Sequence, residues 1–223
     1  MNRNRNRYEK LIRMIVVAVF CALAYVCQFV FRIHVSFLTF DAKDAVMAIA
    51  AMIFGPVWGI VMALIVALLE FLTISGTGVY GLIMNFASSA AFCAISAGVY
   101  KYKRTMMGAV LGLLAAVLGT TALMMLLNVL VTPYYMTGGS IATVVALIPT
   151  LLLPFNLTKT VMNAALVLVL YKPISVALKK TRILKGGPDR FVWDKTTIRV
   201  LVGGLALIVV CVIVFLAALG GTF

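Results

Sequence analysis

Long apolar runs, separated by short polar stretches, make up most of this sequence. They cover residues 11–31, 43–54, 57–73, 79–100, 106–131, 147–171 and 198–219. A helix needs roughly 20 apolar residues to cross a hydrocarbon core of about 30 Å, and most of the runs approach that length. The second and third runs are shorter, and the break Phe54-Gly-Pro-Val-Trp58 separates them. The pattern predicts a bundle of six packed helices with a seventh at the C-terminus.

The composition places this bundle in a lipid bilayer. Hydrophobic residues make up 64% of the chain, charged residues 11%, and the mean hydropathy is +1.15. Backbone groups cannot stay unpaired in lipid, and the alternation typical of a membrane β-barrel is absent, so we predict an all-α membrane protein. We expect a six-helix membrane domain over residues 1–180, a basic cytoplasmic linker over 181–197, and a seventh transmembrane helix with a short outer tail over 198–223. The first run continues to Val30, which favours a membrane helix over a cleaved signal peptide.

Basic residues are concentrated on one side of the predicted topology, and the formal net charge is +13. Sixteen of the nineteen basic residues lie before or at the start of the first run, after the fourth, or between the sixth run and the start of the seventh: Arg3, Arg5, Arg7, Lys10, Arg13, Lys101, Lys103, Arg104, Lys172, Lys179, Lys180, Arg182, Lys185, Arg190, Lys195 and Arg199. Loops rich in lysine and arginine stay in the cytoplasm, so we expect the N-terminus there. The charge therefore reflects membrane topology and contact with lipid, and no nucleic-acid partner is expected.

Small residues recur every four positions in two of the runs. Ala18 and Ala22 form such a pair in the first run, and the third run carries a longer stripe at Gly55, Gly59, Ala63 and Ala67. Small residues at this spacing let helices approach closely. The longer stripe is expected to pack within the bundle, whereas the short pair in the first run is a candidate docking face for another membrane protein.

Lys159 is the most unusual residue of any apolar segment. An ammonium group at bilayer depth costs roughly 2.5–3.5 kcal/mol on insertion scales, so such a residue usually faces a partner, a cavity or a ligand. Asn156 and Asn163 lie three residues before it and four after it, on the same face of a helix. This stripe predicts a polar site inside the bundle. The alternative interpretation is a structural ion pair with Glu70, in which case removal of Lys159 would strand a buried carboxylate.

The polar residues suit recognition of a neutral, flat, hydrogen-bonding molecule. Asn128 interrupts the fifth run near its outer third, as Asn156 and Lys159 interrupt the sixth. An amide offers both a donor and an acceptor, whereas an ammonium offers donors only. Together they match an imide-like edge of carbonyl, N–H and carbonyl groups, while apolar walls hold the ring faces. The loops 32–41 and 132–140 contain aromatic residues that either belong to the membrane interface or cover such a site.

Signals for catalysis, metal binding and nucleotide hydrolysis are missing from the sequence. There is no G-x-x-x-x-G-K-[ST] loop and no H-E-x-x-H motif, and His34 is the single histidine. Asp41 and Asp44 are expected near the outer surface, with no basic partner implied by their spacing. The four cysteines lie in apolar runs without a metal-binding or disulfide spacing. We therefore expect no enzyme activity, no catalytic residue, no metal and no cofactor.

Two blocks of the fifth and sixth runs are distinctive. They are Asn128-Val-Leu-Val-Thr-Pro-Tyr-Tyr135 and the more specific Pro154-Phe-Asn-x-x-Lys159. Both resemble the riboflavin-specific S component, the substrate-binding subunit, of energy-coupling-factor (ECF) vitamin transporters. The resemblance extends to Phe37-Leu-Thr-Phe-Asp-Ala-Lys-Asp44, to Phe54-Gly-Pro-Val-Trp-Gly59 and to Leu170-Tyr-Lys-Pro173, and it covers about residues 8–180.

The resemblance implies a six-helix protein of the bacterial cell membrane that captures riboflavin, its transported substrate, from outside. It would deliver riboflavin by docking to one transmembrane coupling subunit and two ATP-binding-cassette (ABC) ATPases. Carried over, the flavin-binding residues are Asn128, Asn156 and Lys159, with Leu38 and Phe40 from the loop over the pocket. Additional candidates for the pocket or for an ion pair are Glu70, Asn163, Asn85 and Tyr134. Docking would use Ala18 and Ala22, and the seventh helix departs from the six-helix pattern.

Three other interpretations stay open at this point. The chain could be an S component of the same fold for another vitamin or precursor, although the Asn-x-x-Lys block argues against this. It could be an intramembrane enzyme such as a lipid-modifying transferase, which the lack of paired acids and histidines disfavours. It could also be a structural subunit of a larger membrane complex, which would not need Lys159.

Overall fold

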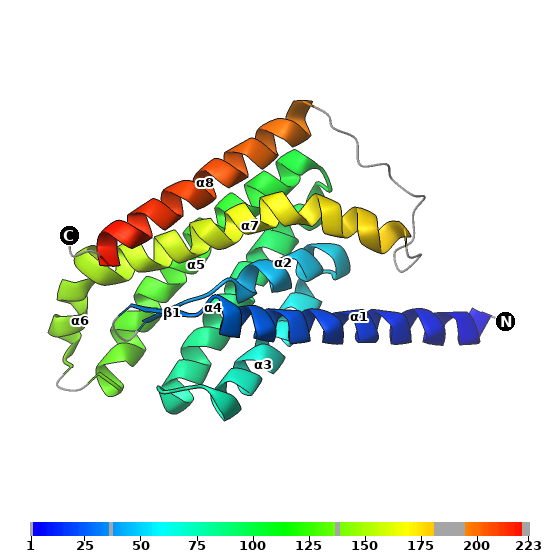
Figure 1. Ribbon diagram of the computed structural model, residues 1–223. Coiled ribbons are helices and arrows are strands. Elements are labelled where there is room, and N and C mark those ends of the chain that lie inside the picture. Colours follow the sequence, from blue (N-terminus) through cyan, green and yellow to red (C-terminus); the bar gives the residue numbers. More distant parts are fainter. Residues whose placement is uncertain (1, 36–37, 137–138, 181–194, 220–223) are drawn as a thin grey trace.

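Helices account for nearly all of the computed structural model, which describes residues 2–35, 38–136, 139–180 and 195–219. In chain order the elements are α1 (Asn2–Val30), β1 (Ile33–Val35), β2 (Leu38–Phe40), α2 (Lys43–Phe54), α3 (Pro56–Thr73), α4 (Gly78–Tyr102), α5 (Met106–Val131), the 3-10 turn η1 (Thr132–Tyr134), α6 (Ile141–Leu147), the π-helical η2 (Ile148–Leu152), α7 (Leu153–Lys180) and α8 (Lys195–Leu219). The long helices lie side by side in one bundle (Figure 1).

The seven apolar runs each contain a helix, which confirms the predicted architecture of six helices and a seventh. Five stretches of the described chain are long and apolar enough to cross a membrane: Lys10–Val30, Pro56–Thr73, Gly78–Tyr102, Met106–Tyr134 and Ile141–Leu178. The helix α2 has only 12 residues, and α8 contributes a shorter apolar stretch over Ile198–Cys211. Most of the predicted linker, residues 181–194, lies outside the described residues.

The break between α2 and α3 has a local cause. Gly55 adopts a φ of +109°, a conformation that side chains with a Cβ rarely take. Pro56 then occupies the first position of α3, where its missing N–H costs no hydrogen bond. The Gly55 amide still closes α2 by donating to the carbonyl of Ala51 at 2.7 Å. The chain therefore turns sharply between two helices that both stay apolar.

Close helix contacts explain the stripe of small residues in α3. A Cβ placed on Gly59 would lie 2.7 Å from the Cβ of Ala51 in α2 and 2.8 Å from the Cβ of Cys93 in α4. Ala63 and Ala67 are buried along the same face of α3. The prediction that this stripe packs inside the bundle is confirmed, because the three helices approach to a distance that larger side chains would prevent.

The last helix, α8, lies along the outer side of α7 (Figure 1). A Cβ on Gly204 would come within 3.0 Å of the Val169 side chain and 3.3 Å of the Ala165 carbonyl oxygen. The opposite face of α8 exposes apolar side chains such as Val202 and Leu205. The helix therefore adds to the outside of the bundle and leaves the interior helices in contact with one another.

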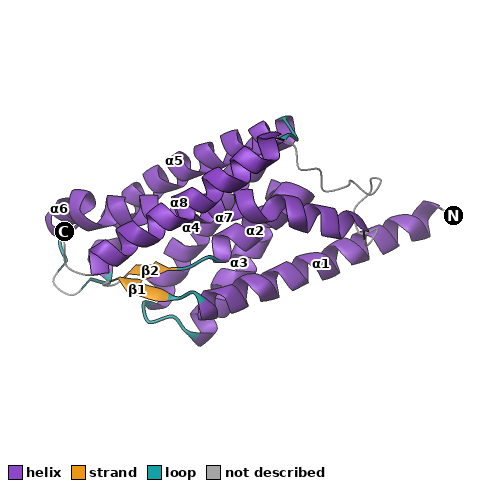
Figure 2. Cartoon of the chain, turned by 45° about the horizontal axis from the view of Figure 1, so that its top comes forward, coloured by secondary structure: helices purple, strands orange, loops and turns teal. Residues whose placement is uncertain are grey.

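A short antiparallel hairpin, β1–β2, follows α1. Ile33 pairs with Phe40, His34 with Thr39, and Val35 with Leu38, while residues 36–37 lie outside the described chain. Figure 2 shows the hairpin toward the end of the bundle that also holds α6, far from the N-terminus. The sequence predicts only a loop at this position. The hairpin was not recognised because each strand has only three residues, too few for a clear strand pattern.

Candidate functional site

A cavity of about 280 Å³ lies at the end of the bundle that carries the hairpin. It is near the lower limit of small-molecule sites, which span roughly 300–1,000 Å³. Its walls come from the hairpin and its flank, the end of α3, the α3–α4 connection, α4, α5, the segment after η1, and α7. The lining residues are Arg32, Leu38, Thr39, Glu70, Ser75, Gly76, Thr77, Gly81, Met84, Asn85, Ser88, Met124, Tyr135, Phe155, Asn156 and Lys159.

Five charged side chains are buried beside this cavity. They are Asp41, Lys43, Asp44, Glu70 and Lys159. The Lys43 ammonium contacts a Glu70 carboxylate oxygen at 2.7 Å and an Asp41 oxygen at 3.9 Å. Asp44 accepts a hydrogen bond of 2.5 Å from the hydroxyl of Ser89 on α4. Buried charges are costly unless each has a partner of opposite sign or a hydrogen bond, and here every member has one.

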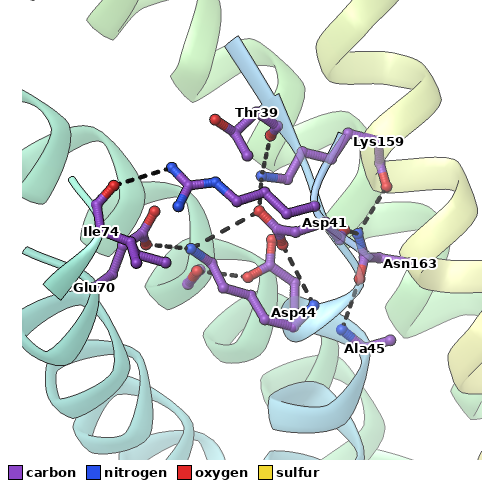
Figure 3. Close-up of polar contacts among 11 residues, drawn as sticks. Thr39, Asp41, Asp44, Ala45, Glu70, Ile74, Lys159 and Asn163 are labelled. Atoms are coloured by element: carbon purple, nitrogen blue, oxygen red, sulfur yellow. Dashed lines mark hydrogen bonds and ion pairs between the residues drawn. The ribbon is translucent and has the colours of Figure 1, made fainter. Parts of the chain in front are cut away.

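Lys159 reaches from α7 to the segment that joins β2 to α2. Its ammonium nitrogen donates to Asp41 Oδ2 at 3.0 Å and to the backbone oxygen of Thr39 at 3.2 Å (Figure 3). An ammonium group carries three donors, so these two contacts leave one N–H. Because Lys159 also lines the cavity, that remaining donor can serve a bound molecule.

The alternative interpretation of Lys159, an ion pair with Glu70, is wrong, because Lys159 pairs with a different acid. Glu70 pairs with Lys43 at 2.7 Å, whereas Lys159 pairs with Asp41 at 3.0 Å. The physical reason is the path of the hairpin, which turns the chain inward before α2 and brings Asp41 and Lys43 between α3 and α7. Glu70 nevertheless lines the cavity, so it lies at the predicted site.

Asp41 and Asp44 are buried, at 1% and 3% exposed. The expectation that they have no basic partner is wrong for Asp41, which lies 3.0 Å from the Lys159 ammonium and 3.9 Å from that of Lys43. Burial by itself raises the pKa of the Asp41 carboxyl, but the nearby ammonium groups of Lys159 and Lys43 hold that pKa below its ordinary value. Asp41 is therefore ionised at neutral pH, as its pairing requires.

Asn163 holds the same inward-turned segment from one turn further along α7. Its Nδ2 donates to the backbone oxygen of Asp41 at 3.0 Å, and its Oδ1 accepts from the backbone N–H of Ala45 at 2.8 Å (Figure 3). Asn163 does not line the cavity. Lys159 and Asn163, which lie one turn apart, therefore clamp residues 39–45 against α7.

Asn128, Asn156 and Asn163 share one local geometry. Each donates from Nδ2 to the backbone oxygen four residues earlier in its helix, at 2.7, 2.8 and 3.0 Å respectively. Asn156 lines the cavity, and this single bond leaves its side-chain oxygen and second N–H for a ligand. Asn128 is fully buried, does not line the cavity, and also accepts from the hydroxyl of Thr132 at 2.9 Å. The amide of Asn156 is thus better placed for a ligand than that of Asn128.

The other predicted pocket residues divide into two groups. Leu38 and Asn85 line the cavity. Phe40 is buried behind the lining and packs edge-to-face on Phe155, with ring centroids 6.2 Å apart. Tyr134 is 75% exposed and stacks on Tyr80 at 6.3 Å. It is the neighbouring residue, Tyr135, that faces the cavity.

Sequence reasoning missed the wall contributed by the α3–α4 connection, and on α4 it found only Asn85. Ser75, Thr77 and Ser88 line the cavity, because the connection folds over the end of the bundle. Arg32 was read only as a loop residue, yet it lines the cavity and donates to the Ile74 backbone oxygen at 3.2 Å. One signal was present in the sequence, since Ser75-Gly-Thr77 is a polar interruption between two apolar runs.

Comparison with known proteins places this arrangement in a family. The model of the family "ECF transporter, substrate-specific component" matches residues 12–171. The chain belongs to this family. It is 31% identical over 177 residues to the riboflavin transporter RibU of Staphylococcus aureus (strain TCH60), covering 75% of this chain and 93% of that protein. A solved structure, the S component of a bacterial ECF transporter, is 29% identical with a TM-score of 0.64, covering 75% of this chain and 97% of the other.

Membership in this family identifies what kind of protein the chain is. A substrate-specific or S component is a membrane transport subunit that acts with an energising module, and it is not an enzyme. The family match ends at residue 171, within α7, so α8 lies outside it. The extra helix is therefore an addition to the S-component bundle, in agreement with its position on the outer side of α7.

The first helix of the S component presents the predicted docking pair outward. Ala18 and Ala22 are both exposed on α1, on a face shared with the exposed apolar residues Ile15 and Val19. The buried face of α1 carries Val16, Phe20 and Ala24 instead. Ala18 and Ala22 therefore point away from the described part of the chain.

Proposed function

We propose that this S component binds riboflavin and delivers it to an ATP-driven importer. The observation that carries the proposal is the pair Asn156 and Lys159, which line one cavity with an amide and an ammonium donor. The flavin ring presents an edge of carbonyl, N–H and carbonyl groups, which needs donors flanking an acceptor. The amide of Asn156 offers both, and the third donor of Lys159 adds another. The 31% identity to a riboflavin transporter supports the same substrate.

The remaining walls suit the rest of a flavin. Leu38, Met84, Met124 and Phe155 supply apolar and aromatic surface for the faces of a flat ring. Other lining residues are polar, and they include Asn85 and the residues of the α3–α4 connection. Riboflavin carries a flexible chain of hydroxyl groups on its ring, and hydroxyl and amide side chains are suitable partners for it.

We further propose that the cavity faces the outside of the cell and that the N-terminus is cytoplasmic. The cavity end holds the C-terminal ends of α1 and α5 and the N-terminal end of α4. Arg32, Lys43 and Lys159 lie at the cavity end, whereas most other basic residues lie toward the opposite ends of these helices, as Arg13 does in α1 and Lys101 in α4. Because loops rich in lysine and arginine stay in the cytoplasm, the cavity end is the outer one.

Energy for transport would come from other chains. The sequence lacks a nucleotide-binding loop, so we propose that the S component docks to one transmembrane coupling subunit that works with two ABC ATPases. Ala18 and Ala22 would form the contact, because small exposed residues let a partner helix approach. Residues 1–180 would suffice for both tasks, with α8 as an outer addition.

Titration of the purified protein with riboflavin tests the proposal. We expect quenching of flavin fluorescence with one saturable site, in the absence of nucleotide. A different vitamin that displaces riboflavin would redirect the assignment within the family. A protein that quenches no fluorescence, or that needs ATP to do so, would contradict the proposal.

A further inference from the structure

Asp41 contacts the proposed ligand-binding lysine without lining the cavity. Its Oδ2 lies 3.0 Å from the Lys159 ammonium, and the carboxylate is 1% exposed. We propose that Asp41 is a positioning residue, which fixes the Lys159 ammonium at the cavity wall so that its third N–H points to the ligand. This inference rests on the proposed function, because it concerns the lysine of that site.

The lysine needs such a partner because its stem is flexible. Four rotatable bonds link the ammonium to the backbone, so in a roomy cavity the group would take several positions. Two contacts, to Asp41 Oδ2 and to the Thr39 backbone oxygen, restrict it. With two of three donors fixed, the direction of the third follows from tetrahedral geometry.

Asp41 can act as a fixed point because it is itself held on both sides. Its backbone oxygen accepts from Asn163 at 3.0 Å, and its Oδ1 accepts from the backbone N–H of Lys43 at 3.3 Å. The Lys43 ammonium lies 3.9 Å from the same Oδ2 that Lys159 contacts. The carboxylate of Asp41 is therefore held in place, and it sets the position of the Lys159 ammonium.

The other two buried acids have different partners. Asp44 accepts from Ser89, and Glu70 pairs with Lys43. Among the described residues, Asp41 is the acid in ion-pair contact with Lys159. The charges of Asp44 and Glu70 also act on Lys159, but neither acid is in ion-pair contact with it. Asp44 is therefore a comparison acid of the same residue type and burial that lacks the contact.

Riboflavin titration of matched variants tests the positioning role. Asp41→Asn keeps the shape but removes the charge, and Asp41→Glu keeps the charge but moves it by one methylene. We expect each to weaken riboflavin binding by about tenfold, since the ammonium loses its fixed direction. Asp44→Asn should weaken binding less than Asp41→Asn does, because Asp44 acts on the Lys159 ammonium through charge alone and does not fix its direction. Melting temperatures without ligand check that each variant is folded.

A double-mutant cycle distinguishes positioning from general support of the fold. In a Lys159→Met background, Asp41→Asn should cause no further loss of riboflavin affinity, because the residue acts through the lysine. An equal loss in both backgrounds would overturn the proposal. Wild-type riboflavin affinity in Asp41→Glu would also overturn the proposal, because it would show that Asp41 only supplies a neutralising charge. If Asp41→Asn does not fold, Asp41→Glu decides the question. Absence of riboflavin binding by the wild-type protein would instead overturn the proposed function, and the positioning role with it.

Discussion

Replacement of Lys159 by methionine should lower both ligand affinity and the stability of the empty protein. The change keeps most of the apolar stem and removes the ammonium with its three donors. On the ligand side, a carbonyl left without its donor in a dry site costs about 1–3 kcal/mol, so riboflavin affinity should fall roughly tenfold to a hundredfold. On the protein side, the contact to Asp41 at 3.0 Å disappears.

The size of the stability loss follows from what Asp41 retains. Breaking a buried ion pair by removing one partner costs about 3–5 kcal/mol, because an uncompensated charge stays behind. Here the Lys43 ammonium is still 3.9 Å from Asp41 Oδ2, so we expect the lower limit, about 3 kcal/mol. For a chain of this size that corresponds to a melting temperature lower by roughly 6–12 °C.

Two measurements test the prediction: the melting temperature of the ligand-free protein and its affinity for riboflavin. The first tests the ion pair with Asp41, and the second tests the ligand role of Lys159. Adding Asp41→Asn to Lys159→Met should recover part of the lost stability, since it removes the stranded charge, but it should not recover affinity. An unchanged melting temperature for Lys159→Met would contradict the ion pair with Asp41. Unchanged affinity in a folded variant would refute the ligand role of Lys159.

Three further changes test other parts of the molecule. Ala22→Leu should leave riboflavin binding intact but abolish uptake in cells, whereas Ala122→Leu, at an exposed position of α5, should leave both unchanged; loss of binding with Ala22→Leu would argue against a docking face. Asn156→Leu should weaken riboflavin binding by about tenfold, and Asn128→Leu by less, because only the first lines the cavity; the reverse order in titrations would contradict this placement. Gly59→Ala should destabilise the empty protein by about 1–3 kcal/mol, read as a lower melting temperature, because its Cβ meets α2 and α4; an unchanged melting temperature would contradict that close approach.

The helices were predictable because the bilayer restricts what a sequence can do. Apolar runs must satisfy their own backbone groups, so each run becomes a helix whose ends follow from polar residues, glycine and proline. Gly55 and Pro56 illustrate this, since the predicted break falls at the junction of α2 and α3. The stripe on α7 was predictable for a similar reason, because residues 156, 159 and 163 share a face by helical geometry alone.

The partners of that stripe were not predictable from periodicity. Lys159 and Asp41 are 118 residues apart in sequence, and only the inward turn after β2 brings them together. A cluster of two acids and a lysine beside a hydrophobic run reads as a polar boundary at the membrane surface. In the folded protein the two lysines pair with Asp41 and Glu70, and Asp44 accepts a hydrogen bond from a hydroxyl, which makes the burial of the cluster tolerable. The cost of burying a single charge therefore does not reveal that these acids are buried, because their partners are buried with them.

The buried charges have a consequence for recognition. A lysine that met its ligand as an unpaired cation would have to lose its hydration on binding, and its flexible stem would have to be ordered at the same time. In this S component both costs are met during folding, because Asp41 and the Thr39 carbonyl already hold the ammonium in a buried position. Ordering the site in advance leaves more of the interaction energy for affinity. Under the proposed ligand role of Lys159, the ion pair would link the stability of the empty protein to the strength of ligand binding, which is why a single substitution at Lys159 is expected to change both.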